Sequence, residues 1–107
     1  MTKTISLLGS TGSIGRQTLQ VARELGLSVA ALTANRQVDL LEQQARTFHP
    51  ILAAAADPTA AAALAMRLSD TDIRVLAGEE GVLAAARLPQ ADTAVTALVG
   101  IAGLAPT

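Results

Sequence analysis

The 107-residue sequence has no cysteine, no tryptophan, no tyrosine and only one phenylalanine. The lack of cysteine excludes disulfides, thiolate metal sites and a cysteine nucleophile. No apolar run reaches the roughly twenty residues of a membrane span. The first residues lead into an apolar strand pattern without the basic and apolar regions of a leader. We therefore expect a cytoplasmic protein without a membrane span or a targeting segment.

The sequence also lacks an excess of either charge. Its 8 basic and 9 acidic residues are interspersed, and the net charge is −1. This balance predicts neither a nucleic-acid partner nor binding to an anionic membrane surface. Half of the residues are hydrophobic, and most of these are alanine, leucine and valine. The length is that of one domain, and the small aliphatic side chains suit helices that pack closely against a sheet.

Short apolar runs alternate along the chain with longer stretches of helical spacing, a pattern typical of β-α-β units. It predicts an α/β protein with a Rossmann-like, doubly wound parallel sheet and helices on both faces. Five strands are expected, at residues 4–9, 28–33, 51–56, 73–77 and 93–99. The usual order for such a sheet is 3-2-1-4-5, which places a ligand crevice where strands one and four meet.

Helical spacing follows each of the first four strands. The first helix carries five residues on one face: Ile14, Thr18, Val21, Ala22 and Leu25. The second helix carries four: Val38, Leu41, Ala45 and Phe48. Gly26 is expected to end the first helix, and His49-Pro50 the second.

The third and fourth helices are predicted from their boundaries. Asp57 as N-cap and Pro58 at the first helical position begin a helix that reaches about Leu68. The fourth begins at residues 78–80, with acids in its first turn, and Pro89 terminates it. We interpret the alanine run at residues 53–56 as part of a core strand and the run at 60–63 as part of the following helix, rather than as sequence repeats.

A glycine-rich turn, Gly9-x-x-Gly12-x-x-Gly15, joins the first strand to the first helix. Such a turn lets a pyrophosphate approach the backbone and presents free N–H groups of the helix start to it. A triphosphate-binding P-loop is excluded because Arg16-Gln17 follows, where Lys and Ser or Thr are required. The pattern favours a dinucleotide-binding turn. The alternative is a glycine turn that is needed only for packing the strand against the helix. The candidate pyrophosphate-binding residues are Thr11, Gly12, Ser13 and Ile14.

The residues after the second strand indicate which dinucleotide binds. An NAD site places Asp or Glu there for the ribose hydroxyls, but this sequence has Asn35-Arg36-Gln37. The guanidinium of Arg36 can pair with a 2′-phosphate, and the two amide side chains can donate to it. We therefore predict NADPH, and the alternative for Arg36 is an ordinary solvated charge.

Catalytic and metal-binding side chains are scarce. With no tyrosine and Lys3 as the only lysine, the Tyr-x-x-x-Lys arrangement of short-chain dehydrogenases is excluded. His49 is interpreted as a helix cap, and the acid pairs Asp70/Asp72 and Glu79/Glu80 as solvated surface. No catalytic or metal-binding residue is predicted, so the chemistry must come from elsewhere.

Two segments, Leu7–Gly15 and Val95–Thr107, together resemble the 1-deoxy-D-xylulose 5-phosphate reductoisomerase family. The resemblance implies NADPH-dependent conversion of that sugar phosphate to 2-C-methyl-D-erythritol 4-phosphate in the non-mevalonate isoprenoid pathway, with a divalent metal (Mg or Mn). By position, residues 11–14 match the family's pyrophosphate turn and residues 35–37 its 2′-phosphate segment. That segment departs from the familiar Gly-Lys-Asn form, most notably at Asn35, which adds a side chain.

The resemblance further implies that residues 97–99 lie near the nicotinamide and that the metal ligands, substrate site and lid lie beyond Thr107. Residues 1–107 are accordingly expected to form an NADPH-binding domain without turnover of its own. The alternatives are a free-standing dinucleotide sensor or interaction module and a different NADP-dependent reductase. We also expect self-association, as a homo-oligomer, through Ile101, Ala102 and Leu104 beside the fifth strand.

Overall fold

The structure, a computed structural model, describes residues 3–96. Five strands and four helices alternate in it: β1 (Thr4–Leu8), α1 (Ser13–Leu25), β2 (Ser28–Ala34), α2 (Val38–Phe48), β3 (Leu52–Ala55), α3 (Pro58–Arg67), β4 (Arg74–Ala77), α4 (Gly78–Ala86) and β5 (Thr93–Thr96). All four strand pairs are parallel. The α/β, Rossmann-like fold predicted from the sequence is therefore confirmed.

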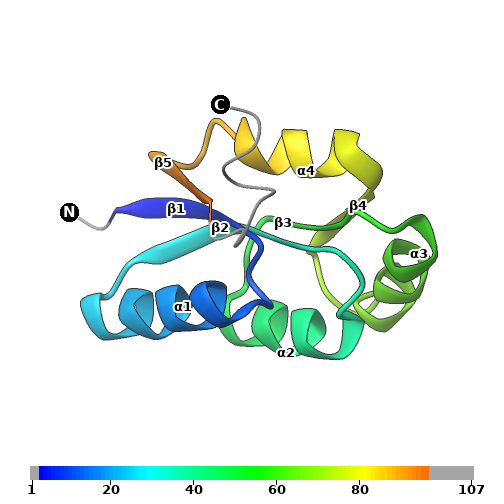
Figure 1. Cartoon of the computed structure of the whole chain (residues 1–107), viewed down its shortest axis with the longest axis horizontal. Coiled ribbons are helices and arrows are strands. Elements are labelled where there is room, and N and C mark those ends of the chain that lie inside the picture. The colour runs from blue at the N-terminus through cyan, green and yellow to red at the C-terminus, as the bar shows by residue number, and fades with distance from the viewer. Residues whose placement is uncertain (1–2, 97–107) are drawn as a thin grey trace.

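The sheet lies between two helical layers (Figure 1), with α1, α2 and α3 on one face and α4 on the other. The larger core cluster fills the space under the first layer and includes Leu7, Leu19, Leu32, Leu41 and Leu64, all almost fully buried. A second cluster beneath α4 contains Leu8, Ala31, Leu52 and Ala85. Small residues let α4 approach the sheet closely.

The strand order is β4-β3-β2-β1-β5, so the predicted order 3-2-1-4-5 was wrong. Parallel strands are joined by right-handed crossovers, so successive units advance in one direction while their helices stay on one face. Because α3 lies on the same face as α1 and α2, β4 is added outside β3. The change of direction comes one unit later, through α4. The crevice at the switch point therefore lies between β1 and β5, not between strands one and four.

The face predicted for the first helix is also not the face that packs on the sheet. Gly15, Leu19 and Ala22 are the buried residues of α1. Of the predicted face only Ala22 is buried, whereas Ile14, Val21 and Leu25 are 47%, 49% and 68% exposed. The helix has apolar residues on two adjacent stripes. The stripe that begins with Gly15, next to the turn, is the one that lies against the sheet.

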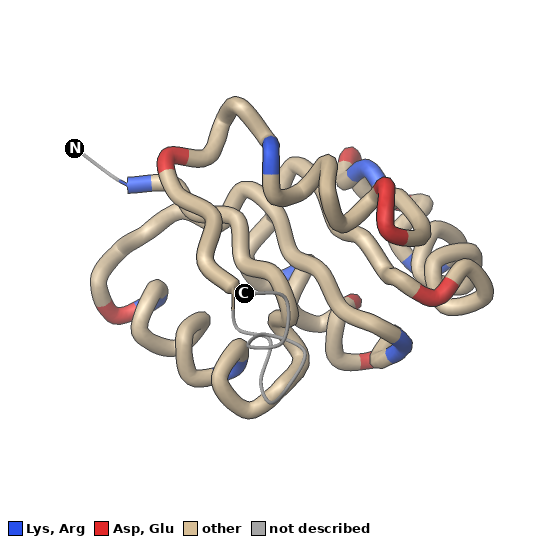
Figure 2. Tube along the Cα trace, turned by 45° about the horizontal axis from the view of Figure 1, so that its top comes forward, with Lys and Arg blue, Asp and Glu red and all other residues tan. Residues whose placement is uncertain are grey.

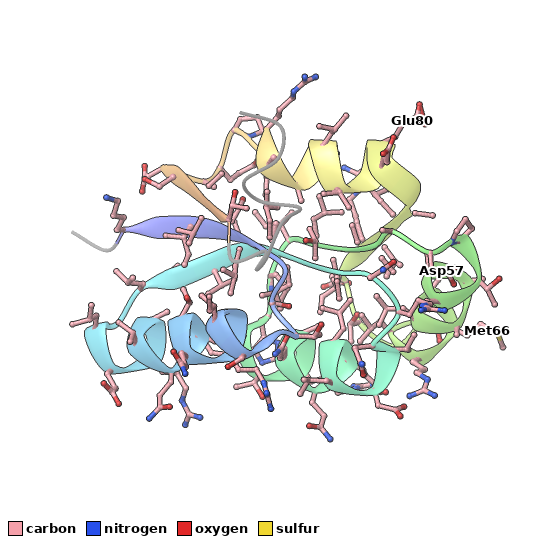
Figure 3. The ribbon with its side chains drawn as sticks, in the orientation of Figure 1. Asp57, Met66 and Glu80 are labelled. Atoms are coloured by element: carbon pink, nitrogen blue, oxygen red, sulfur yellow. The ribbon has the colours of Figure 1, made fainter. Side chains whose placement is uncertain are left out.

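The predicted helix ends are largely confirmed. Gly26 ends α1 with a left-handed φ of 73°. His49 ends α2 in the same conformation, with φ 51°, and its N–H donates to the Ala45 carbonyl at 2.8 Å. Asp57 caps α3 by accepting a hydrogen bond from the Ala60 amide at 2.9 Å, and it stands at the start of that helix in Figure 3. The end of α4 at Ala86 comes three residues before Pro89.

Residues of opposite charge are interspersed along the trace (Figure 2). Two exposed side chains, Met66 and Glu80, project away from the body of the molecule (Figure 3). Between residues 3 and 96 there is no helix with both the length and the apolar character needed to cross a bilayer. The expected nicotinamide contacts at 97–99 and the expected self-association through Ile101, Ala102 and Leu104 fall outside the described residues.

Candidate cofactor-binding site

The three glycines of the turn between β1 and α1 have different structural roles. Gly9 has a left-handed φ of 81°. At Gly15 a Cβ atom would lie 2.1 Å from the Gly9 carbonyl oxygen, so the turn rests directly on the helix start. Gly12 has φ −75°, and a Cβ there would lie 4.0 Å from the Gly9 carbonyl oxygen, an ordinary van der Waals distance. The fold thus accounts for Gly9 and Gly15, whereas the bare backbone at Gly12 is left for an approaching ligand.

The amino-terminal end of α1 is open. Its N-cap, Gly12, offers no side-chain hydrogen bond, and the first turn contains no acid. By contrast, Asp57 caps α3, and Glu79 and Glu80 occupy the first turn of α4. Within residues 3–96 the amides of Thr11, Gly12, Ser13 and Ile14 donate to no other protein group. These four N–H groups and the positive end of the helix dipole form an anion-binding site.

A pocket of about 700 Å³ opens beside this turn. It lies at the carboxyl ends of β1, β2 and β3, the edge where open parallel sheets bind ligands. Among residues 3–96, ten line it: Gly9, Thr11, Gly12, Thr33, Ala34, Asn35, Ala56, Glu79, Val82 and Leu83. Of the seven predicted site residues, Thr11, Gly12 and Asn35 lie in this lining. Ser13, Ile14, Arg36 and Gln37 are exposed residues next to it in the chain.

The segment after β2 begins at the pocket and continues to the start of α2. The Asn35 carbonyl accepts a hydrogen bond from the Asp57 amide at 3.1 Å, which joins this segment to the end of β3. Arg36 is exposed and forms no ion pair with any acid of residues 3–96. Gln37 occupies the N-cap position of α2, where its side chain makes no capping bond. The guanidinium of Arg36 and both amide groups therefore remain available to a ligand.

Several pocket residues were not predicted from the sequence. Thr33 and Ala56 stand at the carboxyl ends of β2 and β3, so the general location of ligands in parallel sheets is a signal that could have found them. Glu79, Val82 and Leu83 come from α4. They reach the pocket only because α4 crosses from the far edge of the sheet to β5, which the sequence pattern does not show.

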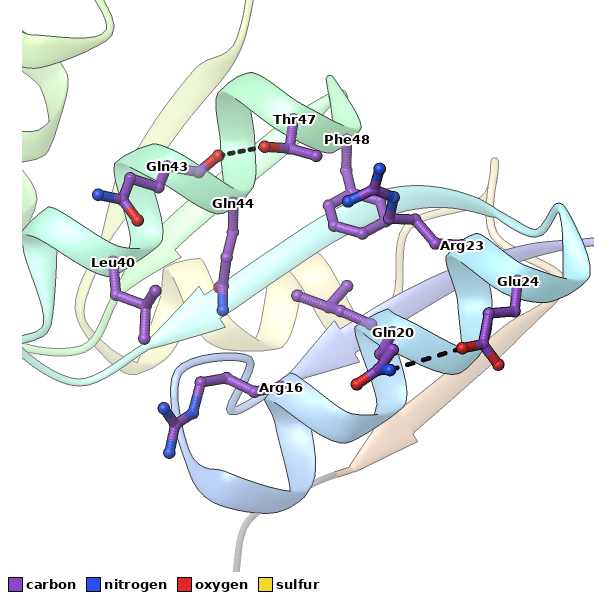
Figure 4. Close-up of a pocket in the computed structure, with 10 residues that line it drawn as sticks. Arg16, Gln20, Arg23, Glu24, Leu40, Gln43, Gln44, Thr47 and Phe48 are labelled. Atoms are coloured by element: carbon purple, nitrogen blue, oxygen red, sulfur yellow. Dashed lines mark hydrogen bonds between the residues drawn. The ribbon is translucent and has the colours of Figure 1, made fainter.

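A second groove, of about 580 Å³, lies between α1 and α2 (Figure 4). Side chains from both helices line it, including Arg16, Gln20, Gln43, Gln44 and Phe48. The two hydrogen bonds drawn there, Gln20 to Glu24 and Thr47 to the Gln43 carbonyl, each stay within one helix. The described residues that line this groove are all different from those that line the first pocket, and one of them, Gln44, hydrogen-bonds to the turn itself.

Five charged side chains of α2, α3 and the turn after α3 form a surface network away from the pocket. Arg46 hydrogen-bonds to Glu42 and Asp70, and Arg67 hydrogen-bonds to Asp39 and Glu42. The Arg46 guanidinium holds the pKa of the Asp70 carboxyl below its ordinary value. Nowhere in residues 3–96 do three His, Asp or Glu side chains come together as metal ligands, so this part of the chain does not fit a metal ion.

Comparison with known proteins agrees with the sequence resemblance. Residues 5–107 match the family model of 1-deoxy-D-xylulose 5-phosphate reductoisomerase. The enzyme of that name from Ruminiclostridium cellulolyticum is 48% identical over 107 residues, which is 100% of this chain and 28% of the relative.

Two solved structures are similar as well. One is a DOX-P reductoisomerase in complex with NADPH, fosmidomycin and magnesium (37% identity, TM-score 0.86, 95% of this chain and 26% of the other). The other is the Zymomonas mobilis reductoisomerase in complex with NADPH (35% identity, TM-score 0.85, 94% and 27%). The chain thus spans about 28% of the length of the curated relative it matches. Because the family model covers nearly all of it, the chain belongs to the 1-deoxy-D-xylulose 5-phosphate reductoisomerase family.

Proposed function

We propose that residues 1–107 are the NADPH-binding domain of a 1-deoxy-D-xylulose 5-phosphate reductoisomerase. The observation that carries this proposal is the uncapped start of α1. Four of its amides have no acceptor in the described part of the chain, and two of these residues, Thr11 and Gly12, line a pocket of about 700 Å³. If the glycine turn served packing alone, there would be no reason for the helix to lack a cap next to a pocket. The NADPH complexes of two structurally similar reductoisomerases support the same assignment.

In the proposed complex the pyrophosphate lies against the backbone of Thr11, Gly12 and Ser13, where the N–H groups and the helix dipole stabilise its charge. The missing Cβ of Gly12 lets the phosphate oxygens come within hydrogen-bond distance. Thr11 and Ser13 contribute hydroxyl groups as additional donors. When bound, NADPH supplies the hydride of the reduction.

Arg36 is the proposed selectivity residue for the 2′-phosphate of NADPH. Its guanidinium has no acidic partner among residues 3–96, and Asn35 and Gln37 on either side carry amide donors. A planar guanidinium pairs with a phosphate through two parallel hydrogen bonds, which NADH cannot accept because it lacks that phosphate.

A calorimetric titration of the chain with NADPH, NADH and NADP tests the cofactor assignment. We expect NADPH to bind more tightly than NADH, and Arg36→Ala to weaken NADPH binding about ten- to a hundredfold while leaving NADH unchanged. Arg87→Ala, at the exposed carboxyl-terminal cap of α4, is the matched control and should have no effect. Equal binding of the two cofactors by the unsubstituted chain would contradict the role of Arg36, and no binding by a folded chain would contradict the assignment.

The enzymatic part of the proposal needs more than this chain. We propose that conversion of 1-deoxy-D-xylulose 5-phosphate to 2-C-methyl-D-erythritol 4-phosphate, and any magnesium it uses, depends on segments equivalent to the other three quarters of the relatives. The chain alone is expected to be inactive. A chimera in which it replaces the matching segment of the Ruminiclostridium cellulolyticum enzyme should turn over substrate with NADPH. A chain that binds NADPH but yields a folded, inert chimera would favour a sensor or interaction module.

A further inference from the structure

Three of the four buried polar residues in the described part of the chain meet at the glycine turn. They are Ser10, Thr33 and Gln44, and the fourth is Ser6 of β1. Burying polar groups costs free energy unless they are hydrogen-bonded. Their concentration at one turn, in a core otherwise made of aliphatic side chains, indicates that this turn is held in a defined conformation.

Two sets of hydrogen bonds hold the turn from opposite sides. On the β2 side, the Thr33 carbonyl accepts from the Gly9 and Ser10 amides at 3.1 and 2.8 Å, and Thr33 Oγ1 accepts from the Gly9 amide at 2.9 Å. On the α2 side, the Ser10 hydroxyl donates to Gln44 Oε1 at 2.6 Å, and Gln44 Nε2 donates to the Ser10 carbonyl at 2.8 Å. Gln44 thereby satisfies both the side chain and the carbonyl of one buried residue.

The Gln44 side chain extends from α2 towards the loop that precedes α1 (Figure 4). It lines the groove between the helices and is not among the described residues that line the larger pocket, so it contacts the turn from outside the proposed cofactor site. The bond to the Ser10 carbonyl fixes the peptide plane that Ser10 shares with Thr11, and the bond from the Ser10 hydroxyl holds the side chain of the same residue. Because the N–H of a trans peptide points opposite to its C=O, this plane sets the direction of the Thr11 amide, from which the backbone continues to Gly12.

We propose that Gln44 is a positioning residue of the NADPH site, which acts by holding Ser10 so that the free amides of residues 11–13 converge on the pyrophosphate. This rests on the proposed function. It predicts that Gln44 contributes to cofactor affinity although it does not touch the cofactor. The reason is that the residues which hold the turn determine how well the amides of residues 11–13 are aligned with the phosphate.

The test compares two substitutions on the buried face of α2. Gln44→Met keeps the length of the side chain and removes both hydrogen bonds, whereas Leu41→Val removes one methylene from a core side chain that makes no hydrogen bond to the turn. Both chains are expected to lose stability in urea. Only Gln44→Met should weaken NADPH binding, about tenfold in calorimetry, and speed hydrogen exchange of the Gly9 and Ser10 amides of the turn relative to the amides of β1.

Ser10→Ala serves if Gln44→Met does not fold, because it removes one of the two bonds and keeps the other. It is expected to weaken NADPH binding about threefold, the equivalent of part of one hydrogen bond. Equal NADPH affinity of unsubstituted, Gln44→Met and Ser10→Ala chains would overturn the positioning role, as would equal losses in Gln44→Met and Leu41→Val. Failure of the unsubstituted chain to bind NADPH would instead refute the proposed function, and the positioning role with it.

Discussion

Gly15→Ala is the substitution whose outcome the structure specifies most sharply. The added Cβ would lie 2.1 Å from the Gly9 carbonyl oxygen and 2.7 Å and 2.8 Å from Ser10 Cα and C. All three atoms belong to the backbone of the turn, and that backbone is hydrogen-bonded to Thr33 and Gln44. No flexible side chain can move aside, so the turn would have to shift by at least roughly 1.3 Å to reach ordinary van der Waals contact.

Overpacking of this kind costs about 1–3 kcal/mol, and strain in the two backbone hydrogen bonds from the turn to the Thr33 carbonyl adds about 1 kcal/mol each. Alanine in place of glycine in a helix contributes about 1 kcal/mol in the opposite direction. The net expectation is a loss of about 2–4 kcal/mol in the free energy of unfolding, or roughly 10–20 °C in Tm for a domain of this size. NADPH binding should be lost as well, because the amides of residues 11–13 move with the turn.

Urea unfolding followed by circular dichroism measures the stability, and calorimetry measures the binding. The matched control is Gly12→Ala, where the new Cβ has no neighbour closer than 4.0 Å and φ is −75°. Its stability should stay within about 0.5 kcal/mol of the unsubstituted chain, while NADPH binding falls because the methyl group occupies the surface the phosphate approaches. A Gly15→Ala chain that is more stable than the original, as helix propensity alone predicts, would refute the argument.

Three further predictions concern the caps and charges. Asp57→Ala removes the bond from the Ala60 amide and should lower the free energy of unfolding by about 1 kcal/mol, whereas Asp57→Ser should retain most of it. Glu79→Gln removes the single ionisable side chain of the pocket lining, so the calorimetric NADPH affinity should rise about two- to threefold at low salt and less at high salt; weaker binding would speak against this placement. The hydrogen bond from Arg46 lowers the pKa of Asp70 in the folded state, so the pair stabilises the fold above about pH 4 and loses this effect as the pH falls. Urea unfolding should show Asp70→Asn to be less stable than the original at pH 7, and this difference should shrink as the pH falls below about 4; a constant difference would contradict the sign.

The features predicted well from the sequence are those that depend on neighbouring residues. Gly26 and His49 end their helices in the left-handed conformation, and Asp57 with Pro58 begins α3, as their residue types predict. The glycine turn follows the same logic, because a strand, a tight turn and a helix start are adjacent in the chain. Local chemistry of this kind is readable since no distant contact is needed to specify it.

The chosen face of α1 could not be predicted in the same way. The helix carries apolar residues on two adjacent stripes, one with Ile14, Val21 and Leu25 and the other with Leu19 and Ala22. Which stripe meets the sheet depends on Gly15, which lets the turn lie directly on the helix. That contact joins two backbones in space, and hydrophobic periodicity does not record it.

The role of Gln44 and the α4 wall of the pocket were missed for a related reason. A glutamine in the middle of an amphipathic helix normally indicates solvent, and only the packing of α2 beside the turn shows that it is buried against Ser10. Glu79, Val82 and Leu83 lie far from the turn in sequence and reach the pocket through the crossover of α4.

The sequence by itself determined the α/β class, the β-α-β alternation, the open glycine turn and the arginine after the second strand, because each depends on a few consecutive residues. The tertiary structure decided the order β4-β3-β2-β1-β5, the buried stripe of α1 and the residues that close the pocket. Strand order depends on which face of the sheet each connecting helix covers. That choice is made by the packing of whole elements against one another, and the same apolar pattern is compatible with either face.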